Sequence, residues 1–160
     1  MKFRLLTILA VSLMTISVFT SGTEAADRYG KQKVVYHING DNPQQNTGAL
    51  RNIQNHINAV GAENMDIRVV MHGNGLAVLL YPDEVEGTKM KRGNANEEMQ
   101  TRITGLKNQG VRFHVCANTL KGRNINLEED LYDASQDDVV PSGVAELSNL
   151  QIQGYTYIKP

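Results

Sequence analysis

The sequence predicts an α/β fold in which a mainly parallel sheet of five strands has helices on both faces. Short, β-branched, apolar segments alternate along the chain with longer segments whose apolar residues recur every three or four positions. That alternation is typical of parallel sheets built from strand–helix–strand units. The first three strand segments are nearly continuous apolar runs, which indicates that both faces of the sheet are covered.

The strands are expected at 33–38, 66–71, 111–115, 138–140 and 155–158. Polar side chains interrupt the first three apolar runs at His37, Arg68, Arg112 and His114. These interruptions indicate strand ends, sheet edges or an interface between subunits.

The first helix is expected to begin with Asn46 or Thr47 as its N-cap. Gly61 is placed to end it in the left-handed region. Its buried face is formed by apolar residues at helical spacing, namely Leu50, Ile53, Ile57 and Val60. A short apolar helix is expected at 76–80.

Three helices are expected in the second half of the chain. Asn96 is the expected cap of one whose buried face is Met99, Ile103 and Leu106. Asn126, with Glu129 three residues later, predicts a capped helix that contains Leu127 and Leu131. The last helix is expected at 144–153.

The first 25 residues have the pattern of a secretory signal peptide. Lys2 and Arg4 precede an apolar run at 5–19, and small residues at 23 and 25 suit cleavage near Ala25. This predicts a periplasmic or secreted protein, with a single domain at 26–160 and no stable membrane span after cleavage. The alternative is an uncleaved N-terminal anchor, although the run is short and rich in hydroxyl groups for a membrane span.

The composition argues against several function classes. The formal net charge is −1, basic residues form no cluster, and tryptophan is absent, so nucleic-acid binding is not expected. The four histidines show no close ligand spacing, and one cysteine cannot build a structural zinc site, so we expect no metal. Phosphate-loop, nucleophile-elbow and zincin motifs are absent, and no cofactor is expected.

Ligands in open parallel sheets bind beyond the carboxyl ends of the strands. The candidate ligand-binding residues at those ends are Asn39, Gly73, Asn74, Gly75, Asn118, Thr119, Ser142 and Gly143. The candidate catalytic residues are Cys116 and His72. A thiol at a helix N-terminus has its thiolate stabilised, and His72 is placed to act as a cation or a proton acceptor. The alternatives are ordinary glycine turns and capping residues, with Cys116 as an inert buried side chain.

The order of these segments resembles the DsrE/DsrF-like family, and in particular an uncharacterised exported branch. The resemblance rests on the segments 34–38, 69–73, 110–116 with 118–120, 139–147 and 154–158. It implies a three-layer α/β/α fold with a mainly parallel five-stranded sheet, and assembly into homotrimers or homohexamers. In the sulfur-relay members a cysteine at a comparable strand end carries a persulfide, and only Cys116 matches that position here.

The first functional hypothesis is therefore an exported sulfur carrier or sulfurtransferase that holds a persulfide on Cys116 and exchanges sulfur with a donor or acceptor protein. Backbone amides after Cys116 and around Gly73 would stabilise the anion, and Asn118 and His72 would orient it. One alternative is a non-catalytic, oligomeric module that binds a small anion or a nucleotide-like ligand. Another is a thiol redox sensor.

Overall fold

The computed structural model describes residues 28–160, so the predicted signal peptide at 1–25 lies outside the described residues. The strands are β1 (Gln32–Ile38), β2 (Met65–Met71), β3 (Arg112–Cys116), β4 (Val139–Val140) and β5 (Thr156–Ile158). The α-helices are α2 (Pro43–Val60), α3 (Glu97–Asn108), α4 (Ala117–Arg123) and α5 (Gly143–Ile152). Short 3₁₀ helices occupy Ala62–Asn64, Gly73–Val78, Pro82–Glu84 and Gln136–Asp138.

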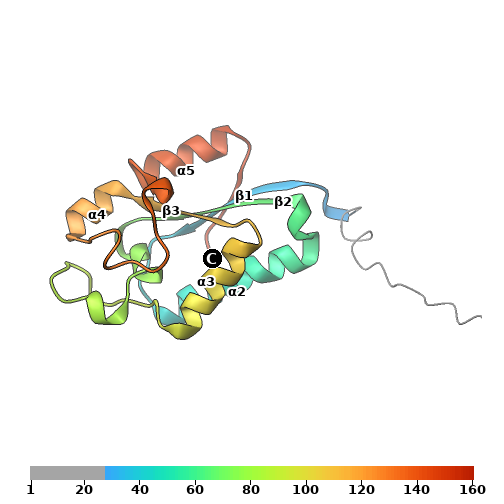
Figure 1. Ribbon diagram of the computed structural model, residues 1–160. Coiled ribbons are helices and arrows are strands. Elements are labelled where there is room, and N and C mark those ends of the chain that lie inside the picture. The colour runs from blue at the N-terminus through green and yellow to red at the C-terminus, as the bar shows by residue number, and fades with distance from the viewer. Residues whose placement is uncertain (1–27) are drawn as a thin grey trace, which may run out of the picture.

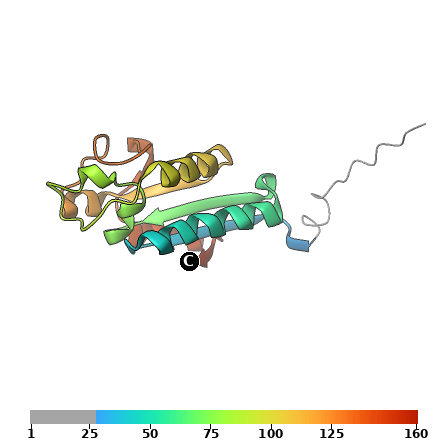
Figure 2. The same ribbon diagram turned by 90° about the horizontal axis from the view of Figure 1, so that it is seen from below.

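The strands form one sheet in the order β4-β3-β2-β1-β5, and every neighbouring pair is parallel. Helices α2 and α3 cover one face, and α5 lies across the other (Figure 1). The view from below shows α2 and α3 in front of the strands (Figure 2). The α/β fold with a mainly parallel five-stranded sheet is thus confirmed.

The main core lies between the sheet and helices α2 and α3. Ile53 from α2 and Ile103 from α3 are fully buried there against Val34, Ile67 and Phe113 of the strands. A much smaller cluster lies under α5 on the other face. It consists of Val35, Val70, Leu147, Leu150 and Tyr155.

The strand register places the four polar interruptions on the face that α5 covers. Arg68 is the direct neighbour of both Val35 and Arg112, and Val70 is the direct neighbour of both His37 and His114. Side chains of neighbouring residues in a parallel sheet point to the same face. Because Val35 and Val70 pack under α5, the four polar residues share that face with them.

Three local expectations need correction. Helix α2 begins earlier than predicted: Pro43 is its first residue, and the Asn42 side chain accepts a hydrogen bond from the Gln45 amide. Asn46 is instead buried inside the helix. The expected apolar helix at 76–80 is a 3₁₀ helix that already begins at Gly73.

The helix predicted to begin at Asn126 does not form, and residues 127–130 are a turn. The Asn126 side chain does accept hydrogen bonds from the Glu128 and Glu129 amides, but the Asp130 carboxylate accepts from the Asn126 amide and closes the segment as a turn. Leu131 then forms an isolated antiparallel bridge with Leu80. The other ends are as expected: Asn96 caps α3 through the Met99 amide, and Gly61 follows α2 with φ of 92°.

Candidate functional site

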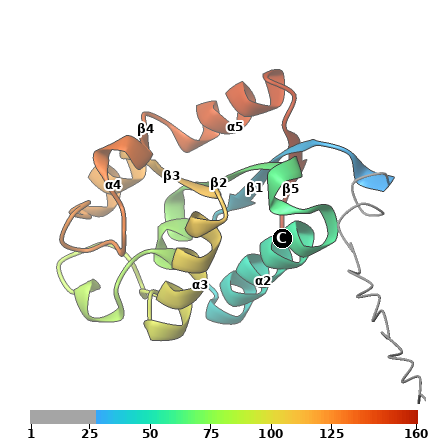
Figure 3. The same cartoon turned by 45° about the vertical axis from the view of Figure 1, so that its right-hand side comes forward.

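The carboxyl ends of β1 to β4 meet at one edge of the sheet, and the candidate residues lie in the turns that leave this edge. Asn39 follows β1, and His72 with the Gly73–Val78 helix follows β2. Cys116 ends β3 and leads directly into α4, while Ser142 caps α5 immediately after β4. Seen from the side in Figure 3, α4 and the first turn of α5 lie close to this end of β3.

Cys116 lies on the sheet face below α5 and is buried, with 4% of its surface exposed. Burial acts to raise the pKa of the thiol. Hydrogen bonds from the Thr119 hydroxyl and from the backbone amides of Gly143, Thr119 and Asn118 oppose this effect. Together they lower the pKa of the thiol below its ordinary value. The sulfur is therefore surrounded by donors from the first turns of two helices, an arrangement that stabilises a thiolate.

Gly143 is the point where Cys116 and His72 approach each other. A Cβ atom at position 143 would lie 2.9 Å from the Cβ of His72 and 3.4 Å from the Cβ of Cys116. Position 143 therefore needs a glycine so that α5 can start this close to the sheet. The same close approach brings the Gly143 amide within hydrogen-bonding reach of the thiol.

Thr119 connects the thiol to the turn after β2. Its hydroxyl oxygen accepts a hydrogen bond of 2.9 Å from the Gly73 amide, and the hydroxyl proton is then free to point at Cys116. The Gly73 amide is thus engaged by Thr119. This differs from the expectation that amides around Gly73 face the anion directly.

Other predicted residues have structural partners elsewhere. The Asn74 side chain accepts a hydrogen bond from Arg123, and the Asn39 side chain accepts one from Lys159. Gly75 allows a close approach of two backbones, because a Cβ there would lie 2.0 Å from the carbonyl oxygen of Ile38. Asn118 contributes its backbone amide to the thiol, and its side chain is exposed.

His72 is engaged by a second histidine that the sequence did not single out as a site residue. Its Nε2 atom lies 2.8 Å from Nε2 of His37, and Nδ1 of His37 lies 2.7 Å from the hydroxyl of Tyr157. Burial lowers the pKa of both imidazoles, and Lys159 adds to the effect, so His72 is neutral at neutral pH. A cationic His72 beside the thiol is therefore not what this geometry favours.

Within residues 28–160, no group of three or more histidine, cysteine, aspartate or glutamate side chains is gathered as a metal site. In the same part of the chain, no helix is both long and apolar enough to cross a membrane.

The fold and the site define a class: α/β proteins with an all-parallel five-stranded sheet between helices and, in this chain, a thiol at a strand end. A family model for the DsrE/DsrF-like family matches residues 33–160. Because this match spans most of the chain, the protein belongs to the DsrE/DsrF-like family.

The solved structures that are similar to this chain include the following two. One is the protein of unknown function MTH1491 from Methanobacterium thermoautotrophicum, with 29% identity, a TM-score of 0.64, and coverage of 81% of this chain and 100% of that one. The other is the ychN protein from E. coli, with 19% identity, a TM-score of 0.58, and coverage of 81% and 99%. At 19% identity the second likeness concerns the fold alone. No curated protein sequence matches the chain.

Proposed function

We propose that the protein is a sulfur carrier that holds a sulfane sulfur on Cys116 as a persulfide. The observation that carries the proposal is the set of donors around Cys116: one hydroxyl and three backbone amides lower the pKa of a thiol that burial alone would raise. An inert buried cysteine needs no such donors. A sulfur carrier does, because the thiolate is the attacking species.

The proposed step is a sulfur transfer between thiolates. The Cys116 thiolate attacks the outer sulfur of a persulfide donor, R–S–S⁻, forming a new S–S bond as the old one breaks. The products are the Cys116 persulfide anion and R–S⁻. With thiosulfate as the donor, the leaving group is sulfite. No external oxidant or reductant is required, and the same exchange in reverse passes the sulfur to an acceptor thiolate.

Two further parts of this proposal concern the setting. The signal-peptide pattern at 1–25 supports a periplasmic or secreted protein that meets its donor outside the cytoplasm. Family membership supports assembly into homotrimers or homohexamers. Measurement of the processed N-terminus by mass spectrometry, and of the molar mass by light scattering, tests these parts separately.

The burial of Cys116 favours one competing function. With 4% of its surface exposed, the side chain could simply form the floor of a binding site for a small anion or a nucleotide-like ligand. In that case the same amides would hold the ligand, and the sulfur would take no part in chemistry.

Intact mass spectrometry decides between the two functions. The protein is incubated with thiosulfate or polysulfide beside the Cys116→Ser variant. We expect a gain of one sulfur atom or more that a reductant reverses and that the variant lacks. An unchanged mass, together with failure of a small alkylating agent to modify native Cys116, would leave the binding module as the function.

A further inference from the structure

His37 and His72 form a pair whose Nε2 atoms point at one another. The two atoms are 2.8 Å apart, the ring centroids are 4.8 Å apart, and the ring planes are inclined by only 23°. The residues are 35 positions apart in the sequence and meet because β1 and β2 are neighbouring parallel strands. Two imidazole nitrogens that converge on one point are a common start of a transition-metal site.

The other nitrogen of His37 is fixed as well. Its Nδ1 atom lies 2.7 Å from the Tyr157 hydroxyl, which projects from β5 on the other side of β1. Metal-binding histidines nearly always have such a hydrogen bond on their second nitrogen, because it sets the tautomer and the ring orientation. Tyr157 thus fixes the orientation of the His37 ring, as the hydrogen-bond partners around a metal site do for the histidines that bind the metal.

The pair also lies at the point of the sheet where ligands are expected. The chain moves from β1 through β2 and β3 to β4 on one side, and then returns to place β5 on the other side of β1. In open parallel sheets ligands bind at such a reversal of strand order. A groove of about 730 Å³ opens there between β5 and α5, and its lining includes His37, His72, Tyr157, Val144, Ser148 and Ile152.

The two rings offer an ion nitrogen ligands only. Their present 2.8 Å contact is a hydrogen bond in which one Nε2 carries the proton and the other accepts it, so metal binding requires the donor ring to carry its proton on Nδ1 instead. No carboxylate among the groove residues competes for the ion, so the oxygen-seeking cations Ca²⁺ and Mg²⁺ do not fit.

We propose that His37 and His72 bind one late first-row transition-metal ion, of the copper and zinc class, between their Nε2 atoms. Water in the groove completes the coordination. With metal–nitrogen bonds of about 2.0–2.1 Å, a tetrahedral ion needs the two nitrogens to separate by only ~0.5 Å from their present distance. Both rings then carry their proton on Nδ1, and the Nδ1–H of His37 donates to the Tyr157 oxygen. Each ring thus keeps its one proton, and metal binding releases none. This site is independent of sulfur transfer on Cys116.

Isothermal titration calorimetry with Zn²⁺, on purified protein without a histidine tag, tests the proposal. We expect saturable binding of one ion, with a heat that does not depend on the ionisation enthalpy of the buffer because no proton is released. His37→Ala and His72→Ala should each weaken binding at least 10-fold. Tyr157→Phe should weaken it about 10-fold through the lost outer-shell hydrogen bond.

Two control variants separate this site from other ligands. His56→Ala should leave binding unchanged, because the two nitrogens of His56 are engaged by Tyr36 and Gln32. Cys116→Ser should also bind normally. Conversely, Lys159→Gln should bind more tightly, since the Lys159 ammonium acts electrostatically on both rings and opposes a cation. A purely structural histidine pair would not show this gain.

Cu²⁺ supplies a spectroscopic readout in the Cys116→Ser background, where no thiol can be oxidised. Copper should bind more tightly than zinc, and its electron paramagnetic resonance spectrum should show coupling to two nitrogens, which falls to at most one in His72→Ala. Absence of saturable binding, undiminished binding in His37→Ala, or loss of binding in Cys116→Ser would each overturn the proposal. If the histidine variants do not fold, Lys159→Gln and Tyr157→Phe decide the matter.

Discussion

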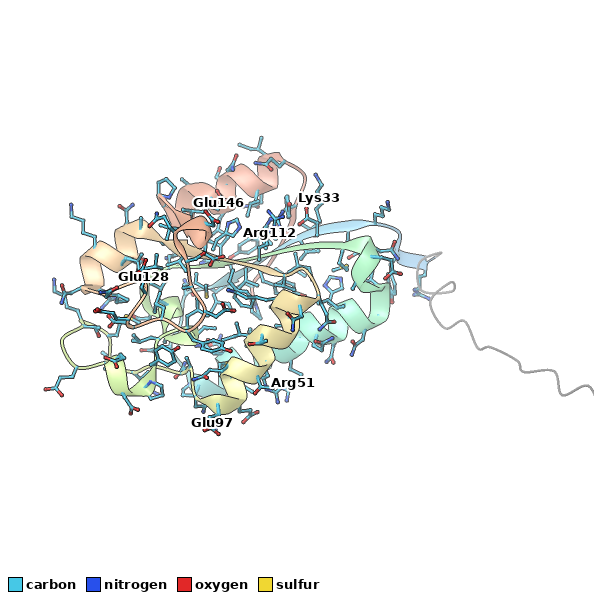
Figure 4. All side chains as sticks on the ribbon, viewed as in Figure 1. Lys33, Arg51, Glu97, Arg112, Glu128 and Glu146 are labelled. Carbon is cyan, nitrogen blue, oxygen red and sulfur yellow. The ribbon has the colours of Figure 1, made fainter. Side chains whose placement is uncertain are left out.

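The two faces of the sheet are built from different residues, although the same strands supply both. The face toward α2 and α3 presents apolar side chains such as Val34, Ile67 and Phe113, all nearly or fully buried. The face toward α5 mixes a small apolar cluster with Arg68 and Arg112 and with histidines. Figure 4 shows Lys33 and Arg112 on the side of the sheet where Glu146 of α5 also lies.

The polar face is held by side-chain pairs more than by apolar packing. Arg68 is 2.9 Å from the Asp66 carboxylate, which also accepts a hydrogen bond from the buried Tyr155 hydroxyl. His114 lies 3.1 Å from Glu146 of α5. Because the larger apolar cluster lies under α2 and α3, we infer that this face supplies most of the stability of the fold. The α5 face carries the thiol, the histidine pair and the groove, where chemistry needs polar groups.

Removal of one large side chain from the apolar face is the strongest test of the difference between the two faces. Phe113→Ala should lower the free energy of unfolding by about 3–5 kcal/mol, because it leaves a cavity in a core with no exposed Phe113 surface. Leu147→Ala in the smaller cluster under α5, where the side chain is 8% exposed, should lower it by about 2 kcal/mol. Denaturant unfolding measures both, and equal effects would refute the division.

A smaller effect is expected where α5 meets the sheet. Gly143→Ala should cost about 1–3 kcal/mol, since the new Cβ would overlap the Cβ of His72 and force a shift of the helix start. Gly105→Ala in α3 is the matched control, because its Cβ would meet nothing within 4 Å. The control should gain about 0.5–1 kcal/mol from helix propensity. Thermal unfolding of both variants distinguishes close approach from glycine content alone.

Thr119→Val tests the donors around the thiol. Loss of the hydroxyl leaves the Gly73 amide without its acceptor, at a cost of about 1–2 kcal/mol, and raises the pKa of Cys116. Thiol alkylation at pH 7, followed by mass spectrometry, should be slower than in the native protein. Thr119→Ser should retain the native rate. Equal rates in all three proteins would show that the hydroxyl does not stabilise the thiolate.

The smallest expected effect is the loss of folding stability at acidic pH. Burial outweighs the Glu146 carboxylate and lowers the pKa of His114 from its ordinary value of 6.5. At a pH between the lowered pKa of His114 in the folded chain and 6.5, this imidazole binds a proton in the unfolded chain but not in the folded chain. Stability is therefore full above pH 6.5 and falls as the pH drops below it. His114→Gln should show a shallower decline from about pH 7 to 5 in denaturant melts. An unchanged slope would assign the acid response to other groups.

Much of the fold was predictable because its signals are local. Apolar periodicity located the strands and the buried faces of α2 and α3, and Asn96 was correctly identified as a cap. The errors arose where neighbouring side chains compete. Asn42 caps α2 because Pro43 after it starts a helix favourably. At Asn126 the cap-like hydrogen bonds form, but the Asp130 carboxylate closes them into a turn.

The site was predictable only in outline. The rule that ligands bind at strand ends selected the segment around Cys116 and the turns after β1, β2 and β4, and the structure brings these turns to the same edge of the sheet. The pairing of His37 with His72, and the contact of Gly143 with both His72 and Cys116, depend on register and on where α5 begins. Neither is encoded in the spacing of residues along the chain. The shared face of His37, Arg68, Arg112 and His114 likewise follows from the alternation of side chains once the strands are aligned.

The two outer strands limit the ways in which copies of this protein can associate. The edges of the sheet are β4, with two residues, and β5, with three. Such short edges offer few unpaired backbone groups on which another chain could build, which protects against aggregation by strand addition. Any assembly of several copies must therefore rely on surfaces made by side chains, and extension of the sheet from one copy to the next is disfavoured.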